Sequence, residues 1–81
     1  MKLTIKCFAV VADVVGGSEA ELDLVDCGTV NDLKQALVGR YPDLERLSSA
    51  LLFAVNGEYA VGGCVLRESD EVACIPPVSG G

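Results

Sequence analysis

The sequence predicts a single α+β domain in which one long helix crosses over a small mixed sheet. Three observations carry this prediction: an alternating strand at the start of the chain, a helix with start and stop signals over residues 29–42, and an Asn56-Gly57 hairpin. With 81 residues, of which 51% are hydrophobic, the chain can build one core. A domain of this size encloses no large active-site cavity. We therefore expect its function on the surface or at the ends of the chain.

The first part of the chain predicts two strands joined by a short helix. Apolar and polar residues alternate over Lys2–Phe8, which is typical of a strand with one buried face, and Phe8 falls in the polar phase. Ala9–Val15 follows as a short helix that Gly16-Gly17 ends. Ser18–Val25 alternates again and predicts a second strand.

The long helix begins at Thr29, a good N-cap with Asp32 three residues later, and stops before Pro42. After it, Leu44 and Leu47 are expected to hold a loop against the core. One face of the helix should pack on the sheet, because its apolar residues recur at helical spacing. These residues are Val30, Leu33, Leu37 and Tyr41.

The remaining elements are a hairpin and a final strand. Ala50–Val55 is a continuous apolar run, as expected of a strand that is covered on both faces or lies in mid-sheet. Asn56-Gly57 favours a tight turn, since both residues accept positive φ, and Glu58–Val61 returns from it. Glu71–Ile75 is the last strand. With the first and last strands as central neighbours, residues 1–75 have the order of a ubiquitin-like β-grasp domain.

The formal net charge of −6 argues against a nucleic-acid partner, because six singly spread Lys and Arg residues cannot replace phosphate counterions. The acidity serves either solubility or steering toward a basic partner surface. Charged residues interrupt the apolar runs before they reach the length of a signal peptide or a membrane span. We therefore expect a cytoplasmic protein with no membrane partner.

Four cysteines lie far apart in the sequence, and the chain has no histidine. Zinc and iron–sulfur sites need closely spaced cysteines, and these spacings are missing, so we expect no metal. The cysteines are interpreted as reduced, partly buried thiols that act as small hydrophobes. They are Cys7, Cys27, Cys64 and Cys74.

The segment after the last strand combines two prolines with two glycines. Pro76 and Pro77 donate no backbone hydrogen bond, so they end sheet pairing and favour a stiff stem. Gly80 and Gly81 lack a Cβ, and a carboxylate on so thin a thread fits a channel that is closed to branched residues. We expect residues 76–81 to form an extended tail. An ordinary frayed chain end is the alternative.

Three segments carry a resemblance to a known family: Leu52-Phe53-Ala54-Val55-Asn56, Asp70-Glu71-Val72-Ala73 and Pro76-Pro77-Val78-Ser79-Gly80-Gly81. They resemble the small, sulfur-carrier subunit of molybdopterin synthase. The resemblance covers essentially the whole chain, and the Pro-Pro-Val-Ser-Gly-Gly ending is its most specific part. Related carriers of thiazole synthesis also end in Gly-Gly, but they usually lack the double proline and the short helix. Ser69, where the family often has glycine, and the Gly62-Gly63 loop depart from the pattern.

The resemblance implies that the chain is the small, non-catalytic subunit of a sulfurtransferase. An E1-like adenylating enzyme would join Gly81 to AMP from ATP, and a sulfur donor protein would then leave a thiocarboxylate on Gly81. Its sulfur would attack a pterin precursor in the large synthase subunit and build the molybdopterin dithiolene. Gly80 would keep the reacting end unhindered. The chain itself would bind no cofactor, and its partners would supply the catalytic groups.

A docking surface is expected beside the tail. Phe8 lies on the otherwise polar face of the first strand, and Tyr59 follows the hairpin. Ile75 is out of phase with Val72 and Cys74, which should face the core. Apolar side chains on a solvent face indicate an interaction surface, and scattered exposed hydrophobes are the alternative. The expected partner-binding residues are Phe8, Tyr59, Ile75, Pro76, Pro77, Val78 and Ser79.

Three other functions fit the same pattern. A ubiquitin-like protein modifier would be joined through Gly81 to lysines of other proteins after the same adenylation. A sulfur carrier of another thiolation pathway, for thiazole or tRNA, also fits. A plain β-grasp interaction module with an incidental ending is the third.

Overall fold

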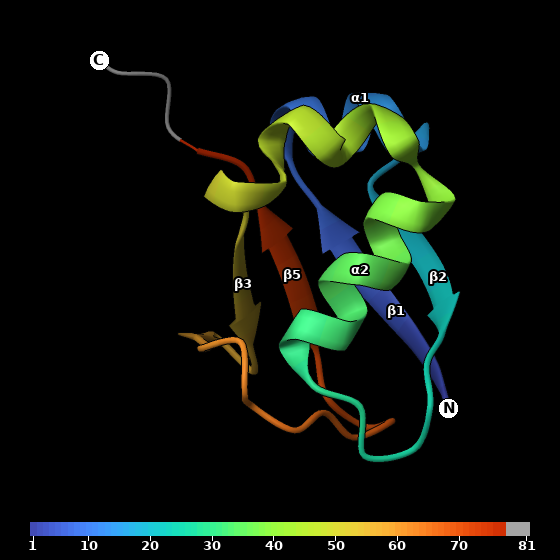
Figure 1. The fold of residues 1–81 in the computed structure, drawn as a ribbon, viewed down its shortest axis with the longest axis vertical. Coiled ribbons are helices and arrows are strands. Elements are labelled where there is room, and N and C mark those ends of the chain that lie inside the picture. Colours follow the sequence, from blue (N-terminus) through green and yellow to red (C-terminus); the bar gives the residue numbers. More distant parts are fainter. Residues whose placement is uncertain (78–81) are drawn as a thin grey trace.

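The computed structural model describes residues 1–77 and has the predicted α+β, ubiquitin-like β-grasp fold. Its five strands form one mixed sheet in the order β2-β1-β5-β3-β4, and the helices lie on one face of it (Figure 1). The elements in chain order are β1 (Lys2–Cys7), α1 (Ala9–Val15), β2 (Glu19–Asp23), α2 (Val30–Arg40), the 3-10 helix η1 (Pro42–Ala50), β3 (Leu52–Val55), β4 (Glu58–Tyr59) and β5 (Val72–Ile75).

The two central strands, β1 and β5, are parallel neighbours, as predicted. Cys7 on β1 is level with Cys74 on β5. On the other side of β5 runs β3, antiparallel, with Leu52 opposite Ile75. Figure 1 shows β5 pointing away from the end of the sheet where the N-terminus lies. The segment after β5 therefore leaves the domain at the end of a central strand.

The long helix α2 begins and ends where its capping residues predict. Thr29 Oγ1 accepts a hydrogen bond from the backbone N–H of Asp32 (3.3 Å), and the Asp32 carboxylate accepts one from the Thr29 N–H (2.9 Å). This reciprocal pair satisfies N–H groups that the start of a helix leaves free. The helix ends at Arg40, before Pro42.

The segment after α2 is a helix, where the sequence predicted a loop. The 3-10 helix η1 starts with Pro42, whose fixed φ suits the first helical position and whose missing N–H costs nothing there. Leu44 is fully buried and Leu47 is partly buried, so the predicted contacts with the core are formed.

The Asn56-Gly57 turn is formed as predicted, with φ values of 53° and 86°. The return strand β4 is shorter than predicted and ends at Tyr59. The apolar run before the turn was expected to be covered on both faces or to lie in mid-sheet. It does lie within the sheet, yet only one of its faces is covered: Phe53 is 3% exposed and Leu52 is 51% exposed.

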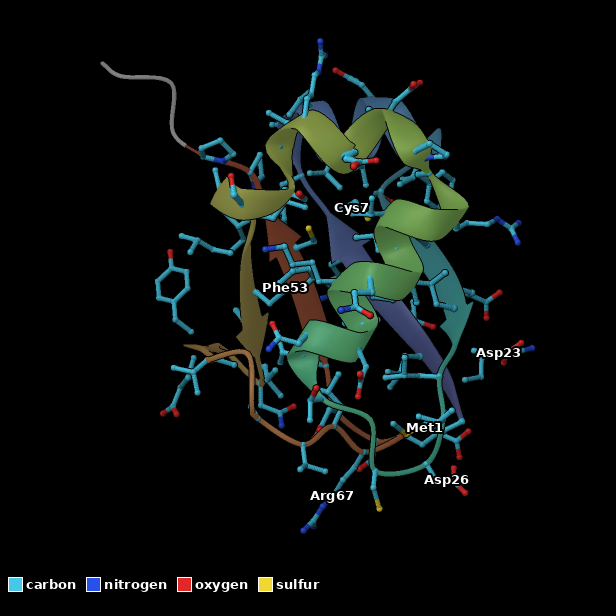
Figure 2. All side chains as sticks on the ribbon, in the orientation of Figure 1. Met1, Cys7, Asp23, Asp26, Phe53 and Arg67 are labelled. Carbon is cyan, nitrogen blue, oxygen red and sulfur yellow. The ribbon has the colours of Figure 1, made fainter. Side chains whose placement is uncertain are left out.

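The core lies between the sheet and the helices, and Figure 2 labels two of its members, Cys7 on β1 and Phe53 on β3. Within residues 1–77, no helix or strand covers the opposite face of the sheet (Figure 1). Nor does this part of the chain hold a helix that is both long enough and apolar enough to cross a membrane. The largest fully buried side chains are those of Leu3, Ile5, Val11, Leu33, Leu37, Leu44, Leu66, Val72 and Cys74.

Candidate docking face

The uncovered face of the sheet has a charged half and an apolar half. On β1 and β2, buried positions alternate with exposed ones, and every exposed position is polar. On the other three strands, the residues in the outward phase are apolar. The polar positions are Lys2, Thr4, Lys6, Glu19, Glu21 and Asp23, and the apolar ones are Leu52, Ala54, Tyr59, Ala73 and Ile75.

Three apolar side chains meet at the carboxyl end of β5, and we call them the tail-base patch: Phe8, Leu52 and Ile75. Leu52 is the direct cross-strand partner of Ile75. Phe8 and Ile75 each follow one residue after the paired, core-facing Cys7 and Cys74, so both point to the open face. Phe8 is 49% exposed and Leu52 is 51% exposed, while Ile75 is partly exposed. The patch borders the point where the chain leaves the sheet.

Tyr59 lies on the same face but farther from the tail. It pairs with Ala54 on the edge strand β4, two residues along β3 from Leu52. Two residues of a strand span about 7 Å, which puts Tyr59 at the rim of the apolar half. Its side chain is 72% exposed. The structure therefore brings together Phe8 and Ile75 of the predicted docking residues and leaves Tyr59 beside them.

Leu52 is the patch residue that sequence reasoning missed. It lies inside an apolar run that was expected to be covered on both faces or to lie in mid-sheet, and neither neighbouring residue distinguishes it. A signal was nevertheless present, because side chains alternate along a strand and the larger Phe53 gains more from burial in the core than Leu52 does. Placing Phe53 inside would have placed Leu52 outside.

Only the first part of the predicted tail lies within the described residues. Pro76 is buried and packs against the domain, whereas Pro77 is exposed to solvent. The predicted functional residues Val78, Ser79, Gly80 and Gly81 lie outside the described residues.

The charged half of the face carries one defined ion pair. Lys6 Nζ lies 2.5 Å from a carboxylate oxygen of Glu71, across the β1–β5 boundary. The hydrogen bond from Lys6, with its charge, lowers the pKa of Glu71, and the same contact raises the pKa of Lys6. Both side chains are largely exposed, so water screens the pair.

The cysteines are free thiols with three different surroundings. Cys7 and Cys74 are buried side by side below the tail-base patch, and Cys64 is half-buried. Burial, reinforced by Cys7, raises the pKa of Cys74 to about 12, which leaves almost no nucleophilic thiolate at neutral pH. Cys27 is exposed at a positive φ of 63°, so the prediction of partly buried thiols is wrong for this residue. Within residues 1–77, no group of three or more His, Cys, Asp or Glu side chains could hold a metal.

The hollows of the surface lie away from the tail-base patch. One of about 560 Å³ separates α2 from η1 on the helical side and is lined by Lys34, Gln35, Pro42 and Glu45, among others. It is an open groove of mixed polarity whose lining includes the opposite charges of Lys34 and Glu45, and it contains none of the predicted site residues. The open face beside the tail is therefore the strongest candidate for a functional surface.

Comparison with known proteins decides the family. The model of the ThiS family matches residues 5–81, which includes the glycines at the end of the sequence. The chain belongs to the ThiS family. A molybdopterin synthase sulfur carrier subunit of Chlamydomonas reinhardtii is 34% identical to this ThiS-family chain over 83 residues, with 100% of both proteins covered. The predicted resemblance to such carriers is thereby confirmed.

A second relative carries a different name. Small archaeal modifier protein 1 of Haloferax volcanii is 38% identical over 84 residues, covering 94% of this ThiS-family chain and 97% of the relative. A crystal structure of the H. volcanii modifier superimposes with a TM-score of 0.84 and 34% identity, over 95% of this chain and 98% of that one. These two relatives carry the names of two of the functions that the sequence left open, the sulfur carrier and the modifier.

A solved complex shares the fold. The complex of subunits 1 and 2 of the molybdopterin-converting factor from Helicobacter pylori contains a chain with a TM-score of 0.67, and 100% of both chains is covered. Its identity of 18% makes this a likeness of fold alone.

Proposed function

We propose that this ThiS-family protein is the sulfur carrier subunit of a molybdopterin synthase and that Gly81 carries the sulfur as a thiocarboxylate. The observation that carries the proposal is where the matched glycines stand. The family match runs through Gly80 and Gly81, and these residues follow a central strand that ends beside an exposed apolar patch. A thin carboxylate-bearing segment next to a docking surface suits a group that must enter a partner's active site.

The chemistry requires activation before sulfur can be attached. The Gly81 carboxylate attacks the α-phosphorus of ATP on an E1-like adenylating enzyme, pyrophosphate leaves, and an acyl-adenylate forms. A sulfur donor protein then attacks the acyl carbon, and AMP leaves. When the donor carries its sulfur as a persulfide, a thiol then reduces the S–S bond to the donor, and the terminal sulfur remains on Gly81 as a thiocarboxylate. The thiocarboxylate sulfur finally attacks a pterin precursor in the large subunit and displaces an oxygen substituent. Water then hydrolyses the resulting thioester, so that Gly81 leaves as a carboxylate and the sulfur stays on the pterin, and two such transfers build the dithiolene.

This chain's own residues bind and present the tail, and they do not catalyse. The described part has no histidine, and the buried pair Cys7 and Cys74 is kept protonated by burial. The partners therefore supply the acid–base groups. The tail-base patch, with Phe8 and Leu52 about half exposed, gives each partner an apolar anchor at the root of the same thread.

The second candidate function is a ubiquitin-like protein modifier, and the H. volcanii relative favours it. The two functions share adenylation of Gly81 and differ in the nucleophile that follows, a sulfur donor or a lysine amine. Intact mass spectrometry after incubation with ATP, an adenylating enzyme and a sulfur source separates them. Replacement of one oxygen by sulfur supports the carrier, a ladder of conjugates supports the modifier, and an unchanged mass contradicts both.

Sulfur loading is expected to survive the loss of all four cysteines. Each Cys→Ala change at the buried positions Cys7 and Cys74 should cost about 1–2 kcal/mol of unfolding free energy through lost packing. Thiocarboxylate formation should stay unchanged, because the acyl carbon of Gly81 accepts the sulfur directly. Intact mass spectrometry and thermal melts of single and combined variants check this. Loss of loading in a well-folded Cys74→Ala variant would indicate a cysteine persulfide route instead.

A further inference from the structure

The Asn56-Gly57 hairpin is bonded to the start of β5 through the side chain of Asn56. The Asn56 Nδ2 donates to Asp70 Oδ1 (3.0 Å), and the Asn56 Oδ1 accepts from the backbone N–H of Glu71 (2.9 Å). The backbone N–H of Asn56 also donates to the carbonyl of Glu71 (2.7 Å). We call these contacts among Asn56, Asp70 and Glu71 the Asn56 clamp. The second Asp70 oxygen accepts from the N–H of Arg67 (2.8 Å), which fixes the carboxylate in place.

The sequence of this turn is chemically labile. In an Asn-Gly pair, the backbone nitrogen of glycine can attack the side-chain amide carbon of asparagine, because glycine has no side chain to hinder the approach. A C–N bond forms, the bond to the amide nitrogen breaks, and ammonia leaves with the proton of the glycine nitrogen. Water then opens the cyclic imide to aspartate or isoaspartate. Asparagine and water are thus converted to an acid and ammonia, with no further reactant.

We propose that Asn56 is a modification site, at which spontaneous deamidation is gated by opening of the Asn56 clamp and weakens the junction between β3 and β5. Both polar atoms of the Asn56 amide are hydrogen-bonded in the closed clamp. The amide must therefore leave Asp70 and Glu71 before the Gly57 nitrogen can reach its carbon.

The product does not re-form the bond to Asp70 at neutral pH. An aspartate at position 56 has no N–H to donate and places a second carboxylate at a contact that is now 3.0 Å long. The bond from the Arg67 N–H, followed by that from the Asn56 amide, lowers the pKa of Asp70. Removing the amide and adding a like charge raises the pKa of Asp70 again in part, and it disfavours the closed hairpin.

The site lies at the opposite end of β5 from the tail-base patch. Asn56 bonds to Glu71, just before β5 begins, whereas the patch surrounds Ile75, where β5 ends. Deamidation is therefore expected to change the stability of the domain and to leave docking per folded molecule unchanged. The test of this proposal measures deamidation at Asn56, so its outcome does not depend on whether Gly81 carries sulfur.

The gating is tested by ageing the purified protein below its unfolding temperature and mapping peptides for aspartate and isoaspartate at position 56. Asp70→Ala removes one partner of the clamp, and deamidation should accelerate about 5- to 30-fold, the factor that a lost hydrogen bond or two gives. Asp13→Ala, at an exposed carboxylate on α1, is the matched control and should not accelerate it. Asn31, the other asparagine, precedes Asp32 and is the internal control. Equal rates in Asp70→Ala and Asp13→Ala, or faster reaction at Asn31, would overturn the proposal.

Exchanging the amide and the carboxylate between positions 56 and 70 tests whether deamidation lowers the stability of the domain. Asn56→Asp places one product in the hairpin and should lower the melting temperature at neutral pH. Repulsion between the carboxylates at positions 56 and 70 raises their pKa in the folded state. The loss of stability is therefore present above that pKa, and stability recovers as the pH falls through it. In Asn56→Asp/Asp70→Asn the amide and the carboxylate exchange places, and the double variant should recover stability at neutral pH. A double variant no more stable than Asn56→Asp would contradict the clamp.

Discussion

Deletion of Gly81, or addition of a single residue after it, is expected to abolish sulfur loading. In the proposed function the carboxylate of Gly81 is the reacting group, and we expect the partner channel that receives it to admit only residues without a side chain. Deletion moves the carboxylate onto Gly80 and shortens the reach by one residue, about 3.5 Å. Intact mass spectrometry after incubation with the adenylating enzyme, ATP and a sulfur source should show no oxygen-to-sulfur exchange in either variant.

The control for the Gly81 variants is folding. The core involves residues of β1, α2 and β5, so a change at Gly81 should leave the melting temperature within a degree or so of the wild type. Addition of a protease-cleavable residue block after Gly81, followed by its removal, should restore loading in the same sample. Full loading of a protein that keeps extra residues after Gly81 would remove the basis of the carrier proposal.

Leu52 and Phe53 are expected to separate docking from folding. They are neighbours in sequence with opposite fates, since Leu52 is 51% exposed on the open face and Phe53 is 3% exposed in the core. Phe53→Ala should cost about 3–5 kcal/mol of unfolding free energy, through lost burial and the cavity it leaves. For a domain of this size, that lowers the melting temperature by more than about 12 °C.

Leu52→Ala should instead weaken binding to the large subunit and to the adenylating enzyme, and Phe8→Ala should do the same. A central anchor of this kind is worth on the order of 1–3 kcal/mol, or about 5- to 150-fold in Kd. Titration calorimetry and thermal melts on each variant measure the two effects. Val25→Ala, at a side chain that is 70% exposed and lies outside the patch, is the control and should change neither. If Phe8→Ala or Leu52→Ala unfolds the domain while affinity per folded molecule is unchanged, the patch is structural.

Local signals with one physical meaning allowed most of the fold to be predicted. The capping pair Thr29 and Asp32 can satisfy a helix start in one way only, and α2 begins there. Asn56-Gly57 tolerates positive φ at both positions, and the hairpin forms there. The alternation over Lys2–Cys7 assigned the two faces of β1 correctly, because a strand with one covered face must alternate.

The errors came from segments whose pattern has two physical readings. A proline ends one helix and is equally suited to begin the next, so Pro42 concealed η1. A continuous apolar run shows no phase, so Leu52 was hidden beside Phe53 until the pairing with Ile75 fixed its side. Cys27 adopts a positive φ, which is uncommon for cysteine and cannot be predicted from its residue type. For Leu52, a contact distant in sequence decided the outcome.

The candidate site was predicted unevenly for the same reason. Phe8 was found because it breaks the polar phase of its strand, and Ile75 because it is out of phase with the core-directed Val72 and Cys74. Each follows one residue after the paired Cys7 and Cys74, so the structure places both on the open face at the end of β5. Tyr59 was assigned to the same surface from its position after the hairpin, and the short strand β4 holds it at the rim. The roles of Gly80 and Gly81 rest on the sequence and on the family match, and they stay a prediction.

The central claim is that sulfur leaves this protein from Gly81, and a single-turnover transfer measures it most directly. Protein carrying isotopically labelled sulfur on Gly81 is mixed with the large subunit and the pterin precursor, and both protein and pterin are followed by mass spectrometry. The account predicts that the label disappears from Gly81, that the carboxylate returns, and that the label appears in the pterin. Label that stays on Gly81, or a Gly81 that becomes joined to a lysine of the large subunit while the pterin gains no sulfur, would contradict it.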